Sequence, residues 1–127
     1  MVGFVVISHS RSLAEGVVEL ARMMTSSVGI SAAGGLEDGT AGTSFEKISA
    51  ALESVYSDDG VIFLVDMGSA VMTAEMVMET NPEKRIVIAD CPIVEGAVLG
   101  TVLAESGSDM DEIMSELASV GSASKFE

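Results

Sequence analysis

Four short runs of apolar residues alternate along the chain with segments in which apolar positions recur at helical spacing. Each run ends in a small polar turn. Continuous apolar runs of this length are typical of strands that are buried on both faces of a parallel sheet. They predict strands over residues 3–7, 28–33, 61–65 and 85–89.

The segments between these strands predict amphipathic helices. Ser12 stands three residues before Glu15, and Thr43 three before Glu46. This is the spacing of a capping box, which predicts Ser12 and Thr43 as the N-cap residues of two helices. The residues expected to face the sheet are Leu13, Val17, Leu20 and Met24 in the first helix and Phe45, Ile48, Leu52 and Val55 in the second. Further helices are predicted up to about residue 80, over 94–105, and over about 110–120 with Asp109 as the cap.

Strands that alternate with helices build βαβ units around a parallel sheet with right-handed crossovers. We therefore predict an α/β fold, a flavodoxin-like open sheet of four strands in the order 2-1-3-4 with helices on both faces. The chain has 127 residues, which suits a single domain. Residues 1–127 are taken as that domain, with 120–127 as a loose tail.

The composition is strongly acidic. Twenty Asp and Glu side chains stand against six Lys and Arg, for a net charge of −14. Such a charge disfavours nucleic acid and anionic membranes as partners and favours proteins with basic faces. It also suggests a high-salt cytoplasm as a second explanation. The longest apolar run, 61–65, is far below the roughly 20 residues that span a bilayer, and the first residues do not resemble a signal peptide, so a cytoplasmic location is expected.

Cysteine and histidine each occur once, as Cys91 and His9. A single cysteine cannot form an internal disulfide, and the two residues cannot make a Cys/His metal cluster. Cys91 is predicted to be a small, partly buried apolar residue. We expect no metal and no cofactor.

The ends of the first and third strands carry the candidate chemistry. His9 follows the first strand and Asp66 follows the third, and the predicted strand order makes these strands neighbours. A carboxylate on one imidazole nitrogen fixes the tautomer and leaves the other nitrogen's lone pair facing outward. The turns and helix N-termini around them favour a phosphate, with Ser10, Gly68 and Ser69 as its candidate ligands. This pattern predicts a nucleophilic histidine beside a phosphate-binding turn.

Simpler interpretations exist for each of these features. His9 is equally typical of an ordinary polar turn, and Asp66 of a cap on the third helix. The glycine-rich segment 34–43 can be a plain connection, and Arg11 can face either a phosphate or a partner. The methionines of the third helix and its preceding turn are core or subunit-interface residues in this interpretation, namely Met67, Met72, Met76 and Met78.

Four motifs along the chain together resemble one protein family. They are Val-Ile-Ser-His-Ser at 6–10, Gly-Gly-Leu-Glu-Asp-Gly at 34–39 leading to Gly-Thr-Ser at 42–44, Asp-Met-Gly-Ser-Ala at 66–70, and Pro-Ile-Val-Glu-Gly-Ala at 92–97. In this order they resemble the phosphotransfer subunit of phosphoenolpyruvate-dependent dihydroxyacetone kinase, DhaM, which is built on the mannose-type enzyme IIA domain. The resemblance covers nearly the whole chain.

The resemblance implies a homodimeric phosphohistidine carrier. The histidine that matches His9 accepts phosphate from the carrier protein HPr and passes it to ADP bound on the subunit DhaL. DhaL then phosphorylates dihydroxyacetone held by the subunit DhaK. Asp66 matches the carboxylate beside that histidine, and Ser69 lies in the accompanying turn.

Three alternatives stay open at this point. Mannose-type sugar transporter components share the domain but have a Gly-Thr-His-Gly kind of turn, whereas this chain has Ser-His-Ser. A receiver domain would use Asp66 as phosphoacceptor, but the acidic pair and the strand-end lysine it needs are missing. A non-catalytic flavodoxin-like binding or regulatory module would hold its ligand at the same crevice.

Overall fold

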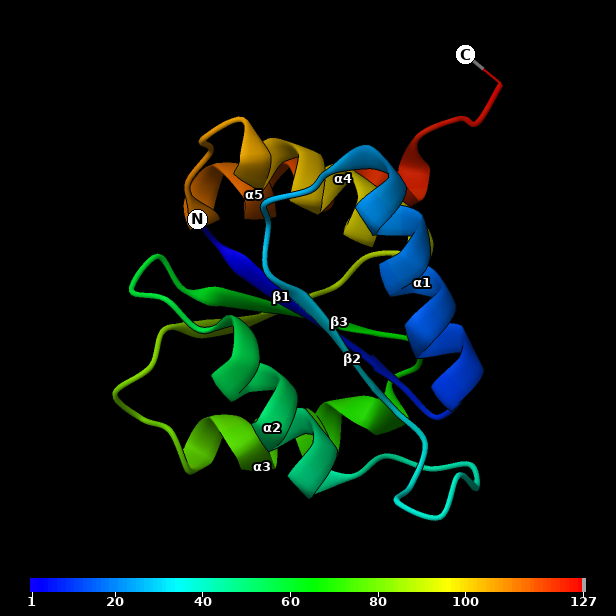
Figure 1. The fold of residues 1–127 in the computed structure, drawn as a ribbon. Coiled ribbons are helices and arrows are strands. Elements are labelled where there is room, and N and C mark those ends of the chain that lie inside the picture. The colour runs from blue at the N-terminus through cyan, green and yellow to red at the C-terminus, as the bar shows by residue number, and fades with distance from the viewer. Residues whose placement is uncertain (127) are drawn as a thin grey trace.

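Four parallel strands form one sheet in the computed structural model, which describes residues 1–126. The strands are β1 (Gly3–Ser8), β2 (Ile30–Gly34), β3 (Val61–Val65) and β4 (Ile86–Ala89). Their order is β2-β1-β3-β4, which confirms the predicted flavodoxin-like arrangement (Figure 1). In register, Ile7 lies opposite Ala33 on β2 and Val65 on β3, so β1 and β3 end side by side.

Helices cover both faces of the sheet (Figure 1). On one side lie α1 (Arg11–Met24), α4 (Ile93–Glu105) and α5 (Met110–Leu117), and on the other α2 (Phe45–Val55) and α3 (Ser69–Glu79). Alternate strand residues supply the two cores. Phe4 and Leu64 belong to the core under α1, α4 and α5, whereas Ile7 and Phe63 belong to the core under α2 and α3.

Two helices are capped by serines other than the predicted residues, so the prediction of Ser12 and Thr43 as caps is wrong. Ser10 caps α1 and Ser44 caps α2, because each has an extended backbone and a hydroxyl that accepts the N–H three residues on. Ser12 lies inside α1, and the hydroxyl of Thr43 contacts Thr73 instead. The prediction of Asp109 as a cap is confirmed: Asp109 and Glu112 form a full capping box on α5.

The buried face of α1 also differs from the prediction. Ala14, Val17 and Ala21 are buried, whereas Leu13, Leu20 and Met24 are 40%, 39% and 60% exposed. Helix α1 packs against both β2 and α4, and small alanines allow this close approach on two sides. The predicted face of α2 is confirmed at Ile48 and Leu52, which are fully buried, with Phe45 and Val55 partly buried.

The C-terminal segment is exposed and contains one short helical turn. Helix α5 ends at Leu117, short of the predicted residue 120, and the 3₁₀ helix η1 (Val120–Ser122) follows. Lys125 forms an ion pair with Glu95 of α4, with Nζ to Oε2 at 2.8 Å. The last position of the predicted tail, Glu127, lies outside the described residues.

Candidate functional site

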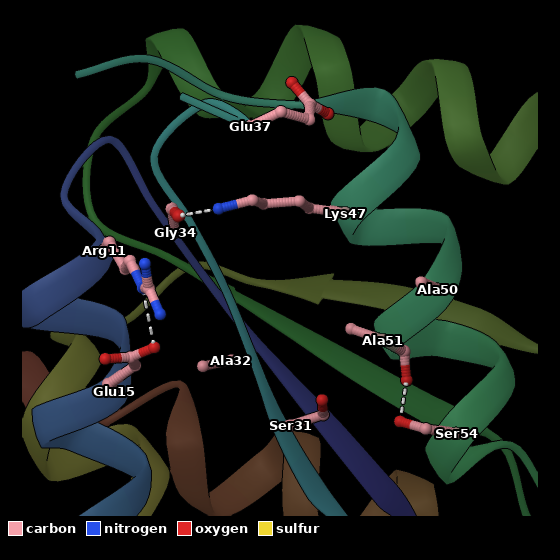
Figure 2. Close-up of a pocket in the computed structure, with 10 residues that line it drawn as sticks. All are labelled: Arg11, Glu15, Ser31, Ala32, Gly34, Glu37, Lys47, Ala50, Ala51 and Ser54. Atoms are coloured by element: carbon pink, nitrogen blue, oxygen red, sulfur yellow. Dashed lines mark hydrogen bonds and ion pairs between the residues drawn. The ribbon is translucent and has the colours of Figure 1, made fainter. Parts of the chain in front are cut away.

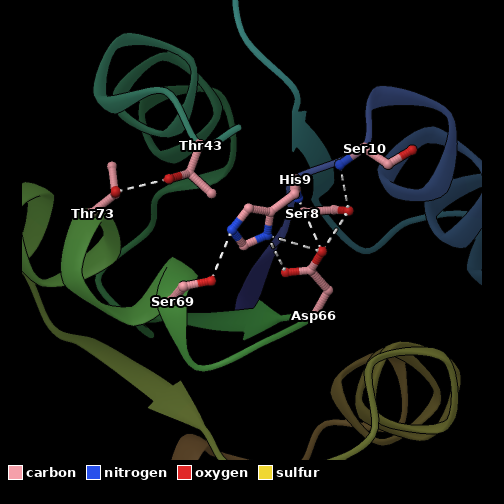
Figure 3. Close-up of polar contacts among 7 residues, drawn as sticks. All are labelled: Ser8, His9, Ser10, Thr43, Asp66, Ser69 and Thr73. Atoms are coloured by element: carbon pink, nitrogen blue, oxygen red, sulfur yellow. Dashed lines mark hydrogen bonds and ion pairs between the residues drawn. The ribbon is translucent and has the colours of Figure 1, made fainter. Parts of the chain in front are cut away.

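His9 and Asp66 face each other at the carboxyl edge of the sheet (Figure 3). His9 follows the last residue of β1, and Asp66 follows the last residue of β3. The imidazole Nδ1 lies 3.0 Å from Oδ1 and 3.3 Å from Oδ2 of the carboxylate. The order of the strands therefore places the two turns together.

The Asp66 carboxylate accepts two further hydrogen bonds. The hydroxyl of Ser8 and the backbone N–H of His9 both donate to Oδ2 at 3.0 Å. Burial of the side chain, which is 10% exposed, raises the pKa of Asp66, but these hydrogen bonds together with the imidazole outweigh that effect, and the net pKa lies below its usual value. An ionised Asp66 can only accept hydrogen bonds, so Nδ1 carries the proton of the neutral ring.

The opposite ring nitrogen contacts α3. His9 Nε2 lies 2.9 Å from the hydroxyl of Ser69, which donates to it when the ring proton is on Nδ1. Ser69 is the first residue of α3, and Gly68, its N-cap, makes no side-chain capping bond. The alternative that Asp66 caps this helix is therefore wrong. Among residues 1–126, the backbone N–H groups of Gly68 and Ser69 have no hydrogen-bond acceptor.

Ser8 is a site residue that the sequence did not reveal. It is fully buried, and its hydroxyl both donates to Asp66 and accepts the backbone N–H of Ser10 at 2.9 Å. Ser10 was itself predicted as a phosphate ligand. Its N–H is bound to the Ser8 hydroxyl, and its own hydroxyl accepts the N–H of Leu13. The one feature of the sequence that could have indicated Ser8 is its place as a polar residue at the end of an otherwise apolar strand.

The glycine-rich segment 34–43 wraps around the backbone of the site. Gly35 donates its N–H to Ser8 O at 3.1 Å, and Gly42 donates its N–H to His9 O at 3.0 Å. Both glycines have positive φ values, +70° and +145°, which side chains rarely adopt. The segment thus holds the strand end that carries His9, in addition to connecting β2 to α2.

The nearby cationic side chains do not reach the imidazole. Arg11 pairs with Glu15 of its own helix, with Nε to Oε2 at 3.0 Å. Lys47 donates to Gly34 O at 3.0 Å inside a pocket of about 520 Å³ along β2 (Figure 2). Such contacts protect the outer carbonyls of an edge strand from other chains. Arg11 and Lys47 are therefore engaged away from the site.

The methionines of α3 and its preceding turn are mostly on the surface. Met67, Met72 and Met76 are 54%, 73% and 53% exposed, so the expectation of core packing is wrong for these three. Met78 packs partly buried against the core under α2 and α3. The three exposed side chains leave an interface role open.

Cys91 is partly buried, as predicted. Burial, and then the charges of Asp90 and Glu95, raise the pKa of its thiol, which therefore stays protonated at neutral pH and is a poor nucleophile. In the described part of the chain no three His, Cys, Asp or Glu side chains gather as a metal site requires. None of the helices described is long and apolar enough to span a bilayer.

Comparisons with known proteins point to one family. The family model EIIA-man, described as PTS system fructose IIA component, matches residues 3–114. The Lactococcus lactis protein named PTS-dependent dihydroxyacetone kinase, phosphotransferase subunit DhaM, is 36% identical over 115 residues, which cover 91% of this chain and 92% of that protein.

One further relative and one solved structure are also similar to this chain. The Escherichia coli K12 protein named PEP-dependent dihydroxyacetone kinase, phosphoryl donor subunit DhaM, is 41% identical over 121 residues. The match covers 90% of this chain but 26% of that protein, so the chain spans about a quarter of this relative. A crystal structure of a protein of unknown function superposes with a TM-score of 0.84 at 28% identity, covering 94% of this chain and 95% of the other. The chain belongs to the EIIA-man family and, within it, to the DhaM-type subunits.

Proposed function

We propose that this chain is a phosphohistidine carrier that accepts a phosphoryl group from HPr on Nε2 of His9 and passes it to ADP bound on DhaL. The transfer drives the phosphoenolpyruvate-dependent phosphorylation of dihydroxyacetone held by DhaK. The observation that carries the proposal is the orientation of one ring: Nδ1 faces the buried carboxylate of Asp66 and Nε2 faces outward to Ser69. The DhaM names of the relatives support the choice of partners.

The transfer needs no general base, because the neutral ring already presents a lone pair at Nε2. This lone pair attacks the phosphorus in line while the bond between phosphorus and the donor breaks. The electron pair of that broken bond leaves with the donor. The proton stays on Nδ1, hydrogen-bonded to Asp66, whose charge stabilises the positive charge that develops on the ring. In the second step an oxygen of the terminal phosphate of ADP attacks, and the electrons of the P–Nε2 bond return to the ring.

Phosphoryl transfer depends mainly on positioning and on stabilising charge. Among residues 1–126 the backbone N–H groups of Gly68 and Ser69 have no hydrogen-bond acceptor, and the hydroxyl of Ser69 contacts Nε2. The Ser69 hydroxyl, which donates to Nε2 in the free protein, turns to a phosphoryl oxygen once the lone pair is used. Preorganised donors of this kind lower the barrier because they cost no reorganisation during the reaction.

The surface charge favours basic protein partners. Apart from the contact of Asp66 with the neutral imidazole, six ion pairs within residues 1–126 engage six of the acidic side chains, so most of the negative charge is not balanced locally. Complementary charge speeds the encounter of two proteins that must exchange a small group.

We also propose that the carrier is a homodimer, as the family resemblance implies. The exposed side chains of Met67, Met72 and Met76 offer apolar surface for such a contact. Sedimentation equilibrium should give twice the mass of the chain, and Met72→Glu with Met76→Glu should lower the association. A chain that stays monomeric at all concentrations rules the dimer out.

Reconstitution tests the function. Phosphoenolpyruvate, enzyme I and HPr should label the chain with a phosphoryl group that is labile in acid and stable in base, and His9→Ala should remove the label. Addition of ADP-loaded DhaL should then discharge the chain with formation of ATP. Label that survives in His9→Ala contradicts the proposal. Label that moves only to a sugar-transporter component supports the mannose-type alternative.

A further inference from the structure

A pair of threonines joins the glycine-rich segment to α3 beside the imidazole. The hydroxyls of Thr43 and Thr73 lie 2.8 Å apart, and either can be the donor. Both side chains are partly buried. Nothing in the proposed transfer so far uses this pair, although Thr43 belongs to one of the four sequence motifs.

Two hydrogen bonds and one helical spacing place the pair on the phosphoryl-accepting side of the ring. The residue before Thr43, Gly42, is hydrogen-bonded to His9 O. Thr73 lies one helical turn after Ser69, so their side chains share a face of α3, and Ser69 contacts Nε2. In Figure 3 the Nε2 edge of the ring points to the side on which Ser69, Thr43 and Thr73 lie.

We propose that Thr43 and Thr73 complete, together with Ser69, a cluster of three hydroxyls that binds the oxygens of the phosphoryl group on Nε2. This inference rests on the proposed function and adds two residues to it. In the free protein one threonine donates to the other, which leaves one hydroxyl hydrogen uncommitted. When the phosphoryl group arrives, both hydroxyls turn to its oxygens, because hydrogen bonds to a charged acceptor are stronger than the neutral one they replace.

Valine and serine variants separate this role from a purely structural one. Thr43→Val and Thr73→Val keep the shape and remove the hydroxyl, whereas Thr43→Ser and Thr73→Ser keep the hydroxyl. We expect the valine variants to lower kcat for phosphorylation by phospho-HPr at least about tenfold, with little change in KM, and the serine variants to restore it. Thr80→Val is the matched control: it lies at the other end of α3, where its hydroxyl donates to Val77 O, and should transfer at the wild-type rate.

A second measurement needs no variant that alters the fold. In the wild-type chain, phosphorylation should shift the methyl NMR signals of Thr43 and Thr73 while that of Thr80 stays in place. Wild-type labelling of His9 together with normal rates in both valine variants, or unmoved Thr43 and Thr73 signals, overturns the inference and leaves the proposed function intact. Wild-type protein that takes no label on His9 refutes the proposed function itself, and the inference with it.

Discussion

Asp66 is the residue on which the geometry of the site depends. Its carboxylate accepts from an imidazole nitrogen, a backbone N–H and a buried hydroxyl, all at the junction of two strand ends. A buried carboxylate with fewer partners would take up a proton and lose its orienting role. Here the hydrogen bonds keep it ionised, so the same contacts that stabilise the fold also fix the tautomer of His9.

The pH dependence of stability should reveal this carboxylate. Because the folded-state pKa of Asp66 is lowered, its stabilisation is present above its unfolded-state pKa of about 3.9 and is lost as pH falls through the folded value. Asp66→Asn should therefore unfold more easily by about 1–3 kcal/mol near neutral pH, and the difference from wild type should shrink in acid. Urea unfolding over a range of pH measures both, and a difference that grows in acid contradicts the assignment.

Transfer should slow in the same variant. An amide does not hold Nδ1–H as an anion does, so phosphorylation of His9 in Asp66→Asn should fall at least tenfold, equivalent to about 1.4 kcal/mol on the barrier. Rapid-quench labelling with phospho-HPr measures this rate. An unchanged rate removes Asp66 from the mechanism.

Ser8 should act through Asp66. Ser8→Ala removes a donor to the carboxylate and leaves the N–H of Ser10 without its acceptor, which should cost about 1–3 kcal/mol of stability. The pKa of Asp66 should also rise, which is measurable by NMR titration. Ser54→Ala is the control, because its hydroxyl donates to Ala51 O within α2, and its effect should be small. Equal stability of the two variants would contradict this role.

Two glycines in the helices differ in how closely the neighbouring residues pack against them. Helix α4 crosses the sheet near Phe4 at Gly100, where a Cβ would lie 2.8 Å from the phenyl ring. Helix α1 contains Gly16, where a Cβ would have no neighbour within 4 Å. The packing of the Phe4 ring therefore requires a glycine at position 100, whereas nothing in the packing requires one at position 16.

Alanine at these two positions should have opposite effects. Gly100→Ala should destabilise the fold by about 1–3 kcal/mol, because the Phe4 ring must move in a packed core. Gly16→Ala should stabilise it by about 0.5–1 kcal/mol, because alanine favours the helix and nothing blocks its methyl group. Thermal unfolding of both variants measures the pair, and a stable Gly100→Ala would show that α4 does not pack as described.

The elements also show where sequence reasoning succeeds and where it stops. Strand order and the meeting of His9 with Asp66 were predictable, because neighbouring parallel strands bring their ends to one edge. Ser8 and the Thr43–Thr73 contact were not, because they depend on rotamers and on the path of a glycine-rich segment. The predicted buried face of α1 is wrong because leucines are more apolar than alanines, yet a helix packed between β2 and α4 buries the smaller side chains.

At the scale of the whole molecule, the net charge of −14 is the dominant feature. Like charges on a compact surface repel one another, and salt screens them over a Debye length that falls from about 30 Å at 0.01 M to about 3 Å at 1 M. The urea midpoint should therefore rise with sodium chloride over this range. A midpoint that does not rise would show that self-repulsion is negligible, and would also remove the suggestion of a high-salt cytoplasm.

The position of the phosphoryl group on the phosphorylated ring tests the proposed mechanism most directly. Nitrogen and phosphorus NMR of the chain labelled by phospho-HPr distinguishes the two ring nitrogens of His9. The geometry predicts phosphate on Nε2 with the proton still on Nδ1 against Asp66. Phosphate on Nδ1, or on any residue other than His9, contradicts it.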